Sequence, residues 1–173
     1  MSNLNGRPVS AEYAPYYDHY ISLVKGENSI AILETQQQEM YAFYESIPSK
    51  KWDFRYAEGK WSIREVLLHV IDTERVFAYR MLRASRNDQT SLPGFDENHY
   101  APNSGADNRS VESLLEEYKA VREATLLLAK NCTAEQFSQH VVASNCTFTP
   151  RSLTFIIAGH EKHHQTIIKE RYL

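Results

Sequence analysis

Apolar side chains recur at intervals of three and four residues in four long stretches of the chain. The first stretch follows Asn28, has apolar positions from Ile30 to Ile47, and is stopped by Pro48. This spacing places the apolar side chains on one face of a helix. The pattern therefore predicts a helix over about residues 28–47.

A second helix is predicted to begin at Ser62. Ser62 and Glu65 have the spacing of a capping box, in which two orphan amides at a helix start are satisfied reciprocally. The apolar positions that follow form one broad stripe, and we expect this helix to end near residue 83 or 84.

The third and fourth helices have equally clear starts. Ser110 precedes an apolar pattern that reaches Ala129. Thr149 is followed by Pro150, and proline is well tolerated at the first helical position, where its missing amide would be unpaired anyway. Between these helices, Thr133 and Gln136 predict a second capping box, and residues 141–148 alternate loosely enough to be extended.

The remaining segments connect these helices. Residues 86–109 hold two prolines, two glycines and many Asn and Asp residues, so they predict a long loop. The first 27 residues have no long period and predict an arm with at most a short helix, packed by its tyrosines. The sequence therefore predicts an all-α, four-helix-bundle domain over residues 28–173. An N-terminal arm (1–27) packs on it, and the long crossing connection leaves room for parallel neighbours.

Length and charge narrow the function. A chain of 173 residues supports one well-cored domain. The net charge of −3 gives no basic surface for nucleic acid. No run of eighteen apolar residues occurs, and the first ten residues lack signal-peptide features, so we expect a cytoplasmic protein without membrane association. Cys132 and Cys146 fit no zinc or redox motif and are expected to be unrelated thiols.

Two histidines lie at the centre of the apolar stripe of the fourth helix. His160 and His164 are four residues apart, which puts both imidazoles on one helix face. The pattern alone leaves open two core histidines satisfied by hydrogen bonds, or two ligands of one metal ion. His163 points elsewhere and is either a flanking surface histidine or a proton-transfer group. Glu161 and its neighbour Lys162 are expected to be solvated.

A third ligand has to come from another helix, and His69 in the second helix is the candidate. It lies off the main apolar stripe, whereas Glu74 lies near its middle. Both positions are compatible with a helix that is buried on two sides. Glu74 is then either paired with Arg80 or Arg122, or a base near the metal.

Three segments carry a resemblance to a known family. WSIREVLLHVIDTERVFAYRMLR, LPGFDENHYAP and IIAGHEKHHQTIIKERYL resemble the DinB/YfiT-like family, and the likeness covers about residues 28–173. The resemblance implies a partly parallel four-helix bundle, frequent homodimers, and a divalent metal such as nickel or zinc. It implies that His69, His160 and His164 are the metal ligands.

The function expected from these features is that of a metal-dependent hydrolase. Three histidine ligands leave a position open for water or substrate, and the bound water becomes the nucleophile. Glu74 and Asp72 are the candidate catalytic bases, with Asp96 as a further carboxylate. Zinc or nickel is expected, with iron and manganese as alternatives. The substrate is expected to be a small molecule that the sequence does not identify.

Two other functions stay open at this point. One is a thiol-dependent S-transferase that acts with a low-molecular-weight thiol, for which Arg80, Arg83 and Arg86 offer positive charge. The other is a non-catalytic metal-binding or ligand-binding stress protein. Residues 87–109 are expected either to cover the mouth of the metal cavity or to serve only as a connection. Metal binding is expected to weaken below about pH 6.5, the ordinary histidine pKa.

Overall fold

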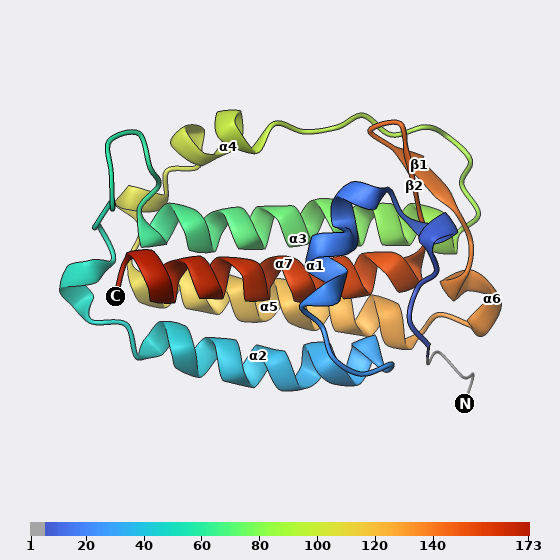
Figure 1. The fold of residues 1–173 in the computed structure, drawn as a ribbon, viewed down its shortest axis with the longest axis horizontal. Coiled ribbons are helices and arrows are strands. Elements are labelled where there is room, and N and C mark those ends of the chain that lie inside the picture. Colours follow the sequence, from blue (N-terminus) through green and yellow to red (C-terminus); the bar gives the residue numbers. More distant parts are fainter. Residues whose placement is uncertain (1–5) are drawn as a thin grey trace.

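Four long helices run side by side along the longest axis of the molecule (Figure 1). This computed structural model describes residues 6–173. The long helices are α2 (Ser29–Glu45), α3 (Ile63–Ser85), α5 (Val111–Lys130) and α7 (Pro150–Arg171). Each begins within about two residues of the prediction, and the first three also end within about two residues of it, so the predicted four-helix bundle is confirmed.

The helices begin where the sequence placed their capping residues. Each capping side chain accepts a hydrogen bond from a backbone amide in the first turn, and the four residues are Asn28, Ser62, Ser110 and Thr149. At α3, Glu65 also accepts from the Ser62 amide (2.8 Å), which completes the predicted capping box. These starts are therefore fixed by local interactions.

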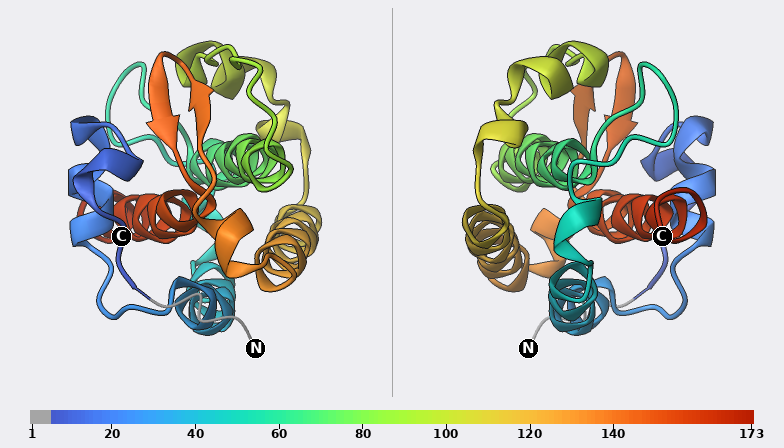
Figure 2. Two further views of the ribbon diagram at one scale, coloured as in Figure 1. Left: turned by 90° about the vertical axis from the view of Figure 1, so that its right-hand side faces the viewer. Right: turned by 90° about the vertical axis from the view of Figure 1, so that its left-hand side faces the viewer.

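The bundle has parallel as well as antiparallel neighbours. Helix α3 packs against α5 and α7, and α2 packs against the same two helices. Seen end-on, α2 and α3 thus occupy opposite corners although they are consecutive in the chain (Figure 2). Helices α3 and α5 run in the same direction because the connection between them crosses the full length of the bundle.

The crossing connection is only partly a loop, which corrects the prediction. It contains helix α4 (Glu97–Asn103) and the 3-10 turn η4 (Ala106–Asn108). Asp96 caps α4 by accepting from the Asn98 amide (2.9 Å). Pro102 disguised this helix in the sequence, because proline ordinarily breaks a helix interior, but here it lies in the last turn.

A small hairpin follows α6 (Ala134–Phe137) at the other end of the bundle. Its strands are β1 (Val141–Ala143) and β2 (Cys146–Phe148), paired antiparallel. Ser144 and Asn145 form the turn, with φ of 53° and 59°. The segment is thus extended as predicted, and it adds a two-stranded sheet that the sequence did not predict.

The N-terminal arm is folded onto the bundle. It contains the 3-10 turns η1 (Ser10–Glu12) and η2 (Pro15–Tyr17) and the short helix α1 (Asp18–Ser22), and α1 packs against α7. The Arg7 guanidinium donates to the carbonyl oxygens of Ile21 (2.8 Å) and Val24 (2.7 Å), which fixes the end of α1. Residues 1–5 of the predicted arm lie outside the described part of the chain.

A buried ionic network joins the four long helices at the centre of the bundle. Arg122 of α5 donates from Nε and Nη2 to Glu74 of α3 (both 2.9 Å), and Nη2 also donates to Glu161 of α7 (3.0 Å). Gln36 of α2 donates to Glu161 (2.6 Å). Arg122 and Glu161 are fully buried. Glu161 was predicted to be solvated, and that prediction is wrong.

Two smaller expectations concern the cysteines and the membrane. Cys132 and Cys146 are both free thiols. Within residues 6–173, no helix is long and apolar enough to span a bilayer.

Candidate metal centre

Three histidine side chains converge between the antiparallel neighbours α3 and α7. His69 extends from α3, and His160 and His164 extend from successive turns of α7. The His160 Nε2 atom lies 3.1 Å from the Nε2 atom of His69 and 3.1 Å from that of His164. One ligand atom from each side chain falls within 4.8 Å of the other two. The structure thus brings together the three residues that the sequence pattern and the family resemblance selected.

This donor set fits a divalent metal ion. Imidazole nitrogens lie about 2.0–2.1 Å from a bound zinc, so two ligands at tetrahedral positions are roughly 3.3 Å apart. The 3.1 Å separations are close to that value. The His69 Nδ1 atom lies 3.5 Å from the Thr73 hydroxyl, a polar neighbour one turn along α3 that can orient the ring.

Burial keeps these imidazoles neutral. Burial, and next the charge of His163, lower the pKa of His69 to about 4. The pKa values of His160 and His164 lie well below the ordinary histidine value, first because of burial and then because the neighbouring imidazoles repel a second positive charge. All three rings therefore carry a free lone pair at neutral pH, as metal ligation requires.

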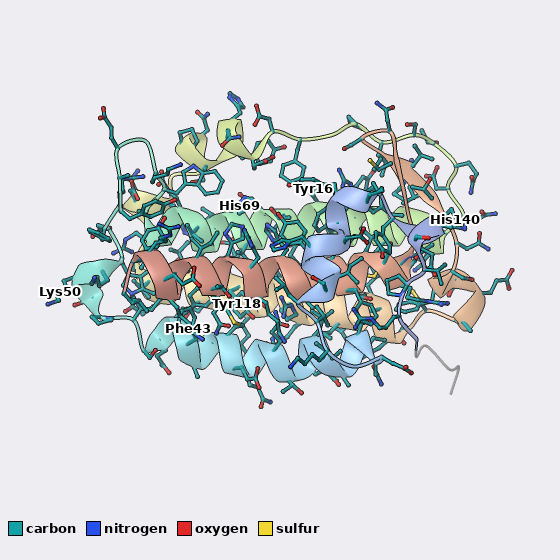
Figure 3. All side chains as sticks on the ribbon, in the orientation of Figure 1. Tyr16, Phe43, Lys50, His69, Tyr118 and His140 are labelled. Atoms are coloured by element: carbon teal, nitrogen blue, oxygen red, sulfur yellow. The ribbon has the colours of Figure 1, made fainter. Side chains whose placement is uncertain are left out.

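The histidines lie on the wall of a cavity of about 400 Å³. Six of the lining side chains are aromatic, and these are Tyr16, Tyr17, Tyr20, Trp61, Phe77 and Phe95. The other polar lining residues are Thr73, Arg80, Glu97, Asn98, Ser144 and His163. Figure 3 labels Tyr16 on the arm and His69 on α3, which lie on the same side of the bundle. A metal at the histidines would therefore face a space large enough for a small organic molecule.

The crossing connection reaches this cavity, as expected. Phe95, Glu97 and Asn98 belong to its lining. Asp96, the carboxylate noted in the sequence, instead caps α4. The connection is therefore part of the site and not only a link between helices.

The two carboxylates predicted as bases lie elsewhere. Glu74 is 3% exposed and bound by Arg122, as the simpler of its two interpretations predicted. Asp72 is half-buried, lies 3.4 Å from Arg75, and has a raised pKa because of burial. Neither residue lines the cavity, so the geometry supports neither as a catalytic base. The acidic side chain that does line it is Glu97.

The three arginines near the end of α3 also differ in whether they reach the cavity. Arg80 lines the cavity. Arg83 forms an ion pair with Asp88, and Arg86 donates to the Ser85 hydroxyl (3.2 Å). Only one of the three therefore offers charge to a ligand in the cavity.

His163 lines the cavity beside the three histidines, a position that the second of its two interpretations, a proton-transfer group, requires. Its Nδ1 atom lies 3.2 Å from Nε2 of His19, an exposed residue of α1. Burial, and next the charge of His19, lower the pKa of His163. The pair connects the cavity with the solvent side of the arm.

Comparison with known proteins agrees with this geometry. The model of the DinB superfamily matches residues 32–168. The chain is 26% identical over 138 residues to a protein of Oceanobacillus iheyensis named "Putative metal-dependent hydrolase", and the match covers 79% of each chain. The solved structure of YfiT from Bacillus subtilis is described as a probable metal-dependent hydrolase with an unusual four-helix bundle topology. It matches with a TM-score of 0.73 and 17% identity, over 95% of this chain and 90% of YfiT, which shows a shared fold.

Proposed function

Because the chain belongs to the DinB superfamily, we propose that it is a hydrolase that works with a divalent metal ion held by His69, His160 and His164. The observation that carries the proposal is the convergence of three neutral imidazoles on the wall of an aromatic cavity. The name of the Oceanobacillus iheyensis relative supports the same class of reaction. The substrate in this proposal is a small molecule that enters the cavity.

A divalent ion in this position supplies Lewis acidity and lowers the pKa of water toward neutrality. Zinc or nickel is the expected ion, because imidazole ligands suit both; iron and manganese are the alternatives. Because the three histidines leave the side facing the cavity open, a substrate has access to the site.

Glu97 is the side chain that we assign to proton transfer. It is half-buried in the first turn of α4 and is the only carboxylate among the cavity-lining residues that the structure describes. A carboxylate near neutral pH accepts a proton readily from an attacking water. His163 and His19 extend this role, since their contact offers a route for the proton to solvent.

Tyr20 contributes a hydrogen-bond donor. Its pKa is raised, first by burial and then by its neighbour Tyr16, so its hydroxyl keeps its proton at neutral pH. Its ring packs edge-on against His160, with ring centroids 5.4 Å apart. It therefore both supports a ligand and presents a neutral donor to the negative charge that develops on a substrate oxygen.

The experiment is incubation of the metal-loaded protein with a panel of esters and amides, with and without cysteine as a small thiol. Thiol-independent hydrolysis that is lost in His164→Ala supports the proposal. Loss of an electrophile only when thiol is present would replace it with the S-transferase function. Tight metal binding without turnover of any member of the panel would favour a non-catalytic binding protein.

Two accompanying expectations are part of this proposal. One is a homodimer, which the family resemblance implies, and the other is a cytoplasmic location. Size-exclusion chromatography with light scattering tests the first, and localisation of the tagged full chain tests the second.

A further inference from the structure

Arg80 is a buried cation in the wall of the cavity. Arg80 is only 2% exposed, and it lines the same cavity as the three histidines. Among residues 6–173, no carboxylate oxygen lies within 4.0 Å of its guanidinium nitrogens. The other fully buried arginine, Arg122, is bound by two carboxylates. Arg80 is therefore exceptional in this bundle.

The partners of Arg80 are neutral. Its Nη2 atom donates to the Ser144 hydroxyl (3.2 Å), and the guanidinium lies 5.3 Å from the ring centroids of both Phe77 and Phe148. Aromatic faces compensate part of the cost of burying a cation. The hydroxyls of Ser144 and Tyr17 are the polar neighbours of the group, and they cannot satisfy all five N–H donors of the guanidinium. A buried charge of this kind ordinarily has an anionic partner.

The position of Arg80 relative to the histidines follows from helix geometry. His69, Thr73, Phe77 and Arg80 follow one another at steps of four, four and three residues, so they share one face of α3, and all four line the cavity. Eleven residues of helix separate the Cα atoms of His69 and Arg80 by roughly 16 Å. The guanidinium of Arg80 lies over Phe77, which is about one turn nearer the histidines along α3, and it also reaches Ser144 and Phe148 of the hairpin.

We infer that Arg80 binds an anionic group of the substrate, and that the substrate is an elongated molecule with a carboxylate at the end remote from the bond that is cleaved. The inference rests on the proposed function for the position of that bond. The aromatic wall between the histidines and Arg80 then holds an apolar middle part.

The charge of the cavity selects a carboxylate over a phosphate. Arg80 is the only Lys or Arg among the lining residues that the structure describes, and Glu97 lines the same cavity. Arg80 lies about three helical turns from His69 along α3, so its single positive charge balances a carboxylate there, whereas a phosphate dianion would keep one negative charge uncompensated at that end of the cavity. A guanidinium fork also binds a carboxylate through two parallel hydrogen bonds.

The test compares 4-phenylbutanoate with its neutral amide, 4-phenylbutanamide, by isothermal titration calorimetry on the metal-loaded protein. Wild type should bind the carboxylate at least about ten-fold more tightly than the amide, because a charge-assisted pair is lost with the amide. Arg80→Met should abolish this preference. Arg83→Gln, which alters an arginine outside the cavity, should keep it. Equal affinity of wild type for the two compounds overturns the inference.

Two further outcomes discriminate between alternatives. If the preference persists in Arg80→Met, the carboxylate is bound by the metal or by another group, and the inference is wrong. If phenyl phosphate binds wild type more tightly than 4-phenylbutanoate, the assignment of a carboxylate is wrong. A protein that keeps an Arg80-dependent preference but binds no metal would contradict the proposed function and leave the anion site standing.

A second measurement covers the case in which Arg80→Met does not fold. The Arg80 Nε–H resonance of wild type, assigned through its absence in the folded Arg80→Lys variant, should shift on addition of 4-phenylbutanoate and not on addition of the amide. An unchanged Arg80 signal at saturating carboxylate overturns the inference.

Discussion

The backbone of Gly159 lies directly against the carbonyl group of Tyr20, so closely that a Cβ atom at position 159 would overlap the Tyr20 carbonyl oxygen. This contact seats helix α1 on α7 one residue before His160. It brings Tyr20 to the cavity, where its ring packs on His160. The arm is therefore a wall of the site, and its position depends on a residue without a side chain.

Replacing Gly159 by Ala should destabilise the protein by about 1–3 kcal/mol, because the arm must move to admit the methyl group. Helix propensity alone predicts the opposite sign, a gain of about 1 kcal/mol. Urea unfolding measures the difference. A more stable Gly159→Ala protein would show that the arm does not sit on α7 in this way.

Replacing Arg122, at the centre of the bundle, should reduce the unfolding free energy more than replacing Gly159. Arg122→Met leaves Glu74 and Glu161 buried without their cation, and the expected loss is about 3–5 kcal/mol of unfolding free energy. Lys130, which pairs with Glu34 on the surface, is the matched control. Lys130→Met should cost less than about 1 kcal/mol. Similar losses in both variants would contradict the described network.

The buried histidines predict a pH dependence of the metal-free protein. The folded-state pKa of His69, about 4, lies below the unfolded value of about 6.5, so protons bind preferentially to the unfolded chain. The stabilisation is complete above pH 6.5 and decreases as the pH falls toward 4. Urea unfolding between pH 7 and pH 5 should show a steeper loss for wild type than for His69→Gln. Equal slopes would contradict the lowered pKa.

The lowered pKa of His69 also changes the pH dependence of metal binding that was expected from the sequence. Metal binding was expected to weaken below about pH 6.5, the ordinary histidine value. In the folded protein, protons compete for His69 only near its lowered pKa of about 4.

Glu97, the base proposed from the structure, and Asp72, a base proposed from the sequence, make different predictions for activity. Glu97→Gln should reduce kcat by roughly 10²–10⁴-fold, the usual contribution of a general base, without changing the metal content. Asp72→Asn should leave kcat within about two-fold, because Asp72 lies outside the cavity. Steady-state kinetics on the best substrate of the ester panel measures both. Loss of activity in Asp72→Asn alone would restore the sequence-based candidate.

The helix starts that are marked by capping residues could be predicted from the sequence. Ser62, Ser110 and Thr149 set helix starts through hydrogen bonds to residues three positions away, so the sequence contains both partners of each interaction. His160 and His164 were equally visible, because their spacing alone puts them on one face of a helix. His69 was a candidate from its place in the second helix, but it lies off the main apolar stripe, and the family resemblance was needed to assign it to the same site.

The missed features depend on contacts between distant segments. Glu161 faces Arg122 and Gln36 across the bundle, and no pattern within α7 shows which face meets them. The tyrosines of the arm have no long period, and their position follows from the contact with Gly159. Glu97 reaches the cavity because α4 folds back over the bundle, and its sequence resembles that of a loop.

The central claim is that His69, His160 and His164 together hold one metal ion. Elemental analysis of the untagged protein by mass spectrometry, set beside the variant in which all three histidines are replaced by Ala, tests it most directly. The account predicts about one divalent ion per chain in wild type and almost none in the triple variant, with far-UV circular dichroism showing that both are helical. A folded triple variant that retains as much metal as wild type would contradict it.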